Sequence, residues 1–240
     1  MSEPQQQEIT AVILKPRERF YAWVADIASS LNSSQSVDIH NIALGSTVLM
    51  IPHGHSSTAF TLYLMEHLNA ILTHEFLRWT PDKALWPLRF DYDLLMQYFD
   101  LEIHTTVLDY NIRNHSNQGN HAQHFRQIIQ DIKKKSILVV KPKTPVHAWL
   151  KQVYSDTLEA LSIQQLDFSL LERDSTVYVL PCSLDSTSKN TAFLKKNAMT
   201  IFEFELEQLI TDKQYWPENR TFDLFSQWFG FEIHSHISTC

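Results

Sequence analysis

Two copies of the motif Glu-x-His contain the residues best suited to chemistry in this chain. Glu102 stands two residues before His104, and Glu232 stands two residues before His234. Residues at this spacing on a β-strand leave the same face, about 7 Å apart. A carboxylate and an imidazole placed in this way can take part in general acid–base catalysis or bind a metal ion. A fold that brought the two strands together would gather two glutamates and two histidines.

A structural role is the alternative for both motifs. Each Glu and His would then form a polar pair on the outward face of a sheet, hydrogen-bonded to a neighbouring helix. Ile103 and Ile233, which lie between the paired residues, would point the other way into the core. The repetition of the motif agrees with either role, because structure alone can impose it.

Two His-x-His motifs are candidate metal ligands. His53 and His55 follow an apolar stretch, and loops at strand ends often carry ligands. His234 and His236 form the second motif. Neither is repeated elsewhere in the chain, and a zinc site needs three or four protein ligands. We therefore expect solvated loops here and no bound cofactor.

Cys182 is a candidate nucleophile, because it precedes a serine-rich segment that can begin a helix. A thiol near a helix N-terminus can have a lowered pKa. No base or orienting group can be assigned to it from the sequence, which makes a catalytic role the weaker interpretation.

A constant offset between matching residues indicates an internal duplication. Residues 82–104 match residues 212–234 at an offset of 130 without a gap. The matches at this offset are Asp-Lys, Trp-Pro, Asp-Leu, Gln, Phe and Glu-Ile-His. Upstream, Lys15-Pro16 returns as Lys141-Pro142, followed in each case by a tryptophan seven residues after the proline. We divide the chain into a disordered segment 1–8, copy one at 9–110, a polar basic linker at 111–136 and copy two at 137–240.

Each copy is predicted to fold as β-α-β-α-α-β. Apolar runs that end in proline predict the first two strands, and helical spacing of apolar residues predicts the helices. The expected ranges are strands at 11–14, 47–51 and 101–108, and helices at 20–31, 60–79 and 91–99. In copy two they are strands at 137–140, 176–180 and 231–237, and helices at 146–153, 192–209 and 221–229. We expect the first two strands of each copy to be parallel, joined by a right-handed crossover.

The predicted fold class is therefore α/β, with a mixed (α+β) sheet. Each copy would form a three-stranded sheet covered by helices. The two tandem repeats would pack as a pseudo-twofold dimer, and the protein would be a monomer with pseudo-dimeric lobes or a homodimer.

The repeated pattern resembles an uncharacterised family of small acidic bacterial domains. The resemblance rests on Lys-Pro…Trp, Trp-Pro-x-Asn-Arg and Trp-Phe-x-x-Glu-x-His-Ser, and it is best between Trp216 and Ser235. Copy one departs from the pattern, with Leu88-Arg89-Phe90-Asp91 in place of Glu218-Asn219-Arg220-Thr221. The resemblance implies a bacterial origin and supports the predicted fold, but it implies no activity.

Charge and composition exclude several classes of function. The net charge of -7 is distributed as -7 over residues 1–110, +4 over 111–136 and -4 over 137–240. Acidic lobes are poor ligands for nucleic acid, because neutralisation of phosphate dominates that affinity. The basic linker is either solvated or in contact with an anion. The four glycines are scattered, which argues against a phosphate-binding loop.

No apolar run approaches the roughly 18 residues that a membrane span needs. The first eight residues lack the pattern of a signal peptide, which predicts a cytoplasmic protein without membrane contact. With no complete catalytic set, we favour a non-catalytic interaction or structural protein that binds another protein. The alternative is a metal-dependent or acid–base enzyme that uses the Glu-x-His strands.

Overall fold

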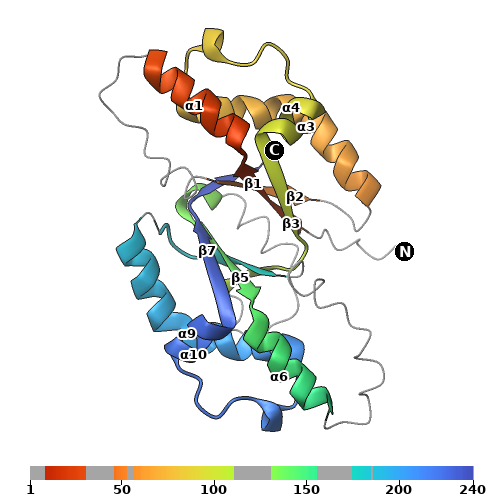
Figure 1. Ribbon diagram of the computed structural model, residues 1–240, viewed down its shortest axis with the longest axis vertical. Helices are drawn as coiled ribbons and strands as arrows, with labels where there is room; N and C mark the ends of the chain where they lie inside the picture. Colours follow the sequence, from red (N-terminus) through yellow and green to blue (C-terminus); the bar gives the residue numbers. More distant parts are fainter. Residues whose placement is uncertain are drawn as a thin grey trace.

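Two mixed sheets and their covering helices form the part of the chain that the computed structural model describes, residues 9–30, 46–52, 57–110, 131–155, 175–184 and 186–239 (Figure 1). The first half contains β1 (Ile9–Pro16), α1 (Glu18–Ser30), β2 (Thr47–Pro52), α3 (Ser57–Trp79), the 3-10 turn η1 (Lys83–Leu85), α4 (Tyr92–Tyr98), β3 (Phe99–His104) and β4 (Val107–Asp109). The second half contains η3 (Ile132–Lys134), β5 (Ser136–Pro142), α6 (Thr144–Ser155), β6 (Thr176–Leu180), α9 (Thr187–Leu209), η4 (Lys213–Tyr215), α10 (Phe222–Trp228), β7 (Phe229–His234) and β8 (His236–Ser238). The predicted α/β class is confirmed.

Two predicted features fall wholly or mostly outside the described residues. They are the disordered segment 1–8 and the basic linker 111–136, of which only residues 131–136 are described.

The two halves exchange their last strands. The first sheet has the order β3-β1-β2-β8, and the second has the equivalent order β7-β5-β6-β4. β8 pairs in parallel with β2, and β4 pairs in parallel with β6. The single strands predicted over 101–108 and 231–237 are therefore wrong, because each breaks after its histidine and continues in the other sheet. Each sheet has four strands rather than the three expected for an isolated copy.

The predicted parallel crossover is also wrong. β1 pairs antiparallel with β2 and with β3, and β5 pairs antiparallel with β6 and with β7. The crossover rule fixes the hand of a connection between parallel strands, but it does not fix whether the strands are parallel. Residues 31–46 separate α1 from β2, which is enough chain to enter the sheet from either end.

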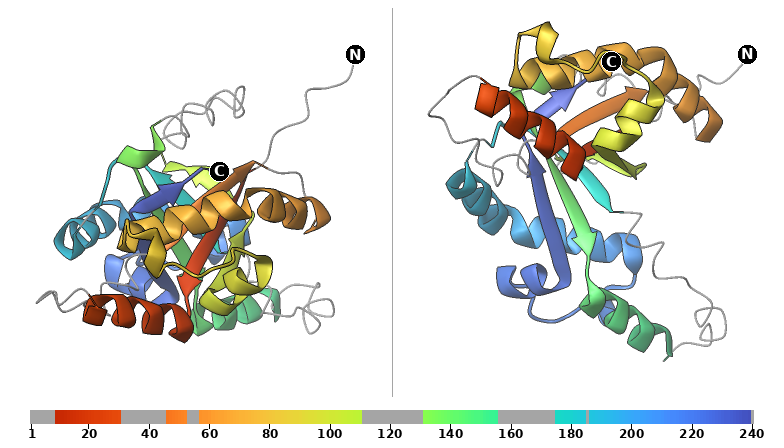
Figure 2. Two further views of the ribbon diagram at one scale, coloured as in Figure 1. Left: turned by 90° about the horizontal axis from the view of Figure 1, so that it is seen from above. Right: turned by 45° about the horizontal axis from the view of Figure 1, so that its top comes forward.

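The two sheets pack against each other and bury an apolar layer between them, which we name the inter-sheet core. The views of Figure 2 show the sheets between the two sets of helices. The inter-sheet core consists of Ile9, Ala11, Ile13, Val48, Met50, Ile132, Ile137, Val139, Val177, Val179 and Ile237. Separate apolar cores lie between each sheet and its own helices. The molecule thus has four layers, helices, sheet, sheet and helices.

Alternation along the central strands explains why they read as continuous apolar runs. Ala11 and Ile13 of β1 face the inter-sheet core, whereas Val12 and Leu14 face the helices of the first half. These four side chains are all at most 1% exposed. A strand buried on both faces needs apolar residues at successive positions, which removes the alternation of a half-buried strand.

The repeated tryptophans fasten the helical layers to the backbone. The indole N–H groups of Trp23, Trp86, Trp149 and Trp216 each donate to a backbone carbonyl at 2.8–3.1 Å. No helix among the described residues combines the length and the apolar character needed to cross a membrane.

Removal of β8 tests the exchange of strands. We expect a chain that ends at Ser235 to show faster amide exchange in β2 of the first half, because residues 47–49 lose their parallel partner. Hydrogen exchange measured by mass spectrometry checks this result. The variant Ile237→Ala keeps the strand but leaves a cavity in the inter-sheet core. We expect it to lower the free energy of unfolding by about 2–5 kcal/mol. If the truncation accelerated amide hydrogen exchange only in β5, β6 and β7, the pairing of β8 with the first sheet would be contradicted.

Candidate functional site

The ends of the central strands bring four charged side chains into the layer between the sheets. Lys15 follows Ala11 and Ile13 on the same face of β1, and Glu102 of β3 lies opposite Ile13 in the strand register. The second half repeats this arrangement with Lys141 and Glu232, which lies opposite Val139. All four charged residues therefore lie at the border of the inter-sheet core. We name Lys15, Glu102, Lys141 and Glu232 the Lys-Glu cluster.

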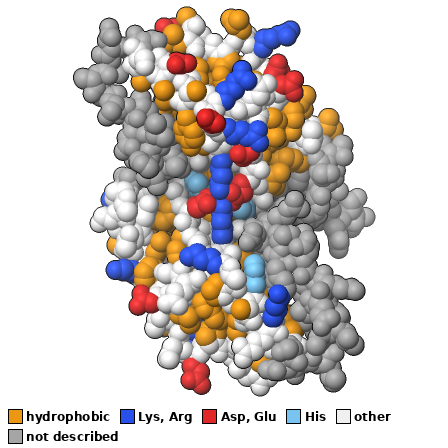
Figure 3. Space-filling view, in the orientation of Figure 1, with side chains coloured by type: hydrophobic (Ala, Val, Ile, Leu, Met, Phe, Trp, Pro, Cys, Tyr) orange, Lys and Arg blue, Asp and Glu red, His pale blue; other side chains and the backbone are white. Residues whose placement is uncertain are grey.

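Each lysine of the Lys-Glu cluster contacts both glutamates. Lys141 Nζ lies 2.5 Å from Glu102 Oε1 and 2.7 Å from Glu232 Oε1. Lys15 Nζ lies 3.3 Å from Glu232 Oε2 and is also paired with Glu102. Lys and acidic side chains meet in this way at the middle of the face in Figure 3, with histidine beside them. Two of these four ion pairs join residues of different halves.

The cluster keeps its carboxylates ionised. Burial alone would raise the pKa of Glu102, but hydrogen bonds from His104, Lys141 and Lys15 outweigh it and hold the pKa well below its usual range. Burial likewise opposes the contacts of Glu232 with His234 and the two lysines, which lower its pKa to about 2. The pKa of Lys15 is raised despite burial, because both glutamates favour its charged form. The two lysines and two glutamates therefore neutralise each other.

The two histidines lie behind the carboxylates and are buried. His104 Nε2 is 2.8 Å from Glu102 Oε1, and the His104 side chain is 1% exposed. His234 Nε2 is 3.5 Å from Glu232 Oε2, beyond good hydrogen-bonding geometry. Neither ring nitrogen of His234 has a hydrogen-bond partner, and Nδ1 of His104 has none. The two motifs thus differ in detail, because the contact between imidazole and carboxylate is longer in the second half.

The structure brings the two Glu-x-His motifs together, so four of the predicted site residues share one region. The alternative position on an outward sheet face is wrong, because the motifs lie between the sheets. Ile103 and Ile233 do lie on the opposite face of their strands. Ile103 is nevertheless 42% exposed, since β3 is an edge strand, and only Ile233 packs against a core.

The geometry of the Lys-Glu cluster fits a structural role, in which ion pairs hold the two halves together, better than an acid–base site. Glu102 and Glu232 are ionised far below neutral pH, so neither can donate a proton at pH 7. As bases they are poor, because each already accepts from two ammonium groups. A buried ion pair is strongly destabilising when one partner is removed, which makes the four residues mutually dependent.

His234 and His236 lie in different surroundings. His234 faces the layer between the sheets, whereas His236 lies beside Thr47 at the end of the first sheet. Burial and the charge of Arg78 lower the pKa of His236, and Glu75 partly opposes them. Within the described ranges, no three His, Cys, Asp or Glu side chains are grouped closely enough to hold a metal ion.

Of three further candidates, only Cys182 lies among the described residues, and it takes no part in the cluster. His53 and His55 lie outside the described residues. Cys182 is a free, partly buried thiol in the turn after β6, where it packs against the helix-side core of the second half.

The two lysines of the Lys-Glu cluster were not predicted as site residues from the sequence. Lys15 and Lys141 were recognised only as part of the repeated Lys-Pro, although their position two residues after Ile13 and Val139 predicts the same strand face. Alternation along a strand was the available signal.

A second pair of equivalent acids lies on the long helices. Glu75 and Glu205, which are 2% and 6% exposed, are 130 positions apart, the offset of the duplication. Arg78 donates to Glu75 at 3.1 Å, and Thr176 donates to Glu205 at 3.1 Å. Tyr178 also donates to Glu205. Glu205 bonds α9 to β6, whereas Glu75 bonds to Arg78 of its own helix, and Arg78 in turn donates to Thr47 of β2. The constant offset was the signal that could have revealed both acids.

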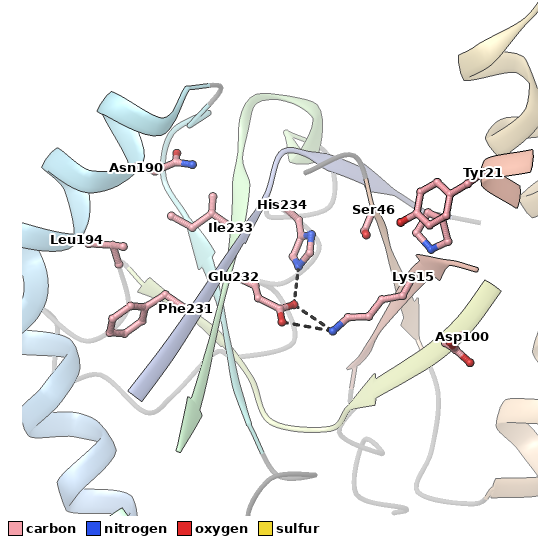
Figure 4. A pocket seen from close by; sticks show the side chains of 11 residues that line it. Lys15, Tyr21, Ser46, Asp100, Asn190, Leu194, Phe231, Glu232, Ile233 and His234 are labelled. Carbon is pink, nitrogen blue, oxygen red and sulfur yellow. Dashed lines mark hydrogen bonds and ion pairs between the residues drawn. The ribbon is translucent and has the colours of Figure 1, made fainter. Parts of the chain in front are cut away.

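A cavity of about 630 Å³ adjoins the second Glu-x-His motif. It is lined by Lys15, Pro16, Tyr21, Ser46, Asp100, Asn190, Leu194, Phe231, Glu232, Ile233 and His234 (Figure 4). The lining comes from β1, α1 and β3 of the first half and from α9 and β7 of the second half. The cavity is therefore built between the halves rather than within either one.

Comparison with family models, curated proteins and solved structures finds no match to this chain. The geometry alone therefore guides the functional interpretation.

Neutralisation of the two carboxylates tests the cluster through its dependence on pH. Because the folded pKa values are depressed, their stabilisation is complete above the unfolded pKa of about 4.3 and is lost as the pH falls through the folded values. We expect Glu102→Gln plus Glu232→Gln to lower the free energy of unfolding at pH 7 by about 1–3 kcal/mol, between the limits for exposed and buried pairs.

The same variant should show a flatter stability profile between pH 5 and pH 2 in urea titrations. Glu218→Gln, at an exposed acid, is the matched control and should leave the profile unchanged. A double variant as stable as the parent, with the same pH profile, would contradict the stabilising role of the Lys-Glu cluster.

Proposed function

We propose that this protein is a non-catalytic interaction protein whose two halves form one rigid frame for binding another protein. The observation that carries the proposal is the mutual neutralisation of Lys15, Glu102, Lys141 and Glu232. The glutamates of both Glu-x-His motifs are thus engaged in holding the frame together. They are therefore not available as an acid, a base or a set of metal ligands.

The architecture supports a binding role. Two halves joined by exchanged strands cannot separate without losing a strand from each sheet, so surfaces shared by both halves keep a fixed shape. The cavity between the halves is such a surface. Preorganised surfaces of this kind reduce the entropy lost on association.

The acidic balance favours a neutral or basic protein partner over nucleic acid. The exchange of strands within one chain favours a monomer over a homodimer, since each sheet receives its fourth strand from the same polypeptide.

An acid–base enzyme is the second candidate, favoured by one observation. His234 is buried beside the cavity, and its Nδ1 has no hydrogen-bond partner. An imidazole in this position can exchange a proton with a bound molecule. It lacks a second ionisable group that is free to complete the transfer, because Glu232 is engaged by the two lysines and by His234 itself.

Crosslinking in the native host tests the interaction role. We expect the chain carrying a single photo-crosslinking residue at Asn190, on the rim of the cavity, to form a discrete protein adduct. The same residue at Glu218, far from the cavity lining, is the matched control and should give no such adduct.

The enzyme candidate has its own test. Elemental analysis of untagged protein that reveals a stoichiometric metal would support that candidate against the interaction role. So would loss of a cellular function on His234→Gln in a protein of unchanged stability.

A further inference from the structure

The cavity between the halves follows one edge of the second sheet. β7 is the last strand in the order β4-β6-β5-β7, so among the described strands only β5 pairs with it. Phe231 and Ile233 line the cavity from one face of β7, and Glu232 and His234 line it from the other. A cavity that reaches side chains of both faces must lie along the unpaired edge of the strand. Figure 4 shows the two sets on opposite sides of the β7 ribbon.

The strand register identifies which backbone groups point into this cavity. Lys143 N–H donates to Trp228 O at 2.8 Å, which makes these residues a hydrogen-bonded pair at the start of β7. Hydrogen-bonded and non-bonded pairs alternate along antiparallel strands. Gly230, Glu232 and His234 therefore bond to β5. It follows that the N–H and C=O groups of Phe231 and Ile233 point outward, away from β5.

Buried polar side-chain atoms without partners border the same edge. His234 is 4% exposed, and neither of its ring nitrogens is hydrogen-bonded. The carboxamide oxygen of Asn190 on α9 is also buried and without a partner. Buried polar atoms in native proteins are seldom left unpaired, because each one costs about 1–3 kcal/mol. Nε2 of His234 lies 3.5 Å from Glu232 Oε2, so among the described residues Nδ1 of His234 and the carboxamide oxygen of Asn190 are the two atoms with no partner near this edge.

The two walls of the cavity differ in polarity. Beside α9 the lining is apolar, with Leu194, Phe231 and Ile233. On the side of the first half it is polar, with Lys15 and Ser46 among its residues. A strand that entered between these walls would direct alternate side chains to each of them.

We propose that the outer edge of β7 is the docking site for an extended segment of a partner protein, which adds to the second sheet as a fifth strand. This inference rests on the interaction role proposed above and names its partner chemistry. The segment alternates apolar residues, which pack against Leu194 and Phe231, with polar residues, which reach His234. Its backbone satisfies the outward groups of Phe231 and Ile233, as in other complexes formed by strand addition. Basic flanking residues complement the net charge of -7.

Selection from a phage-displayed library of random dodecapeptides against the full chain tests this proposal. We expect enriched peptides that alternate apolar and polar residues and lack acidic residues. The best peptide is then synthesised, and its affinity is measured by calorimetry for the parent chain and for two proline variants.

Ile233→Pro removes an outward N–H that β5 does not use, so the second sheet keeps its own hydrogen bonds. We expect this variant to bind the peptide at least about tenfold more weakly, the effect of losing one or two hydrogen bonds. Ile103→Pro, at the equivalent position of edge strand β3, is the matched control and should leave the affinity unchanged. N-methylation of the peptide amides that face β7 should weaken binding to the same extent without any change to the protein.

Failure to enrich any peptide would overturn the proposal, as would equal binding by the N-methylated peptide. Unchanged affinity of Ile233→Pro would also overturn it. The outcomes separate this inference from the interaction role. A cellular crosslink at Asn190 that survives Ile233→Pro would retain the interaction role but place the contact elsewhere. Loss of the crosslink in every form of the chain, including the parent, would remove the interaction role itself.

Discussion

The exchange of the last strand between the halves determines where the polar groups of this protein lie. After His104 and after His234 the chain leaves one sheet and enters the other, so β4 and β8 tie the two sheets face to face. The inter-sheet core can form only when both sheets are present. The Lys-Glu cluster then closes one border of that core, where the apolar alternation of β1 and β5 ends at Lys15 and Lys141. Hydrophobic burial and charge pairing thus act at the same interface, and both fix the position of one sheet against the other.

The repeated polar residues acquire a consistent explanation within this frame. A glutamate at the border of an apolar layer is destabilising unless it is paired. Two lysines from the neighbouring strands meet this requirement for both glutamates. Every member of the cluster has an equivalent in the other half, at the same position in the strand register. His234 departs from this symmetry, since it lacks the hydrogen bond that His104 makes. The departure coincides with the cavity, which suggests that the second half is the one adapted to bind.

Much of the local structure could be predicted from the sequence, because it depends on neighbouring residues. The spacing of Phe20, Val24 and Ile27 predicts α1, and Ser186, Asp91 and Thr221 accept from the backbone as the expected caps of their helices. Strand direction and partner choice could not be predicted in this way. They depend on which sheet offers a free edge to residues 107–109 and 236–238, and single-strand patterns do not contain that information. The parallel crossover and the three-stranded sheets were wrong for this reason. The evolutionary duplication remains a prediction from the sequence.

The pairing of charges across the halves is the central claim of this account. A double-mutant cycle between Lys15 of the first half and Glu232 of the second half measures it most directly, using Lys15→Met, Glu232→Gln and the combined variant in urea unfolding. The account predicts a favourable coupling energy of about 0.5–2 kcal/mol, because removal of either partner costs the other one of its two ion pairs in a partly buried site. Additive effects of the two substitutions, with no coupling beyond experimental error, would contradict it.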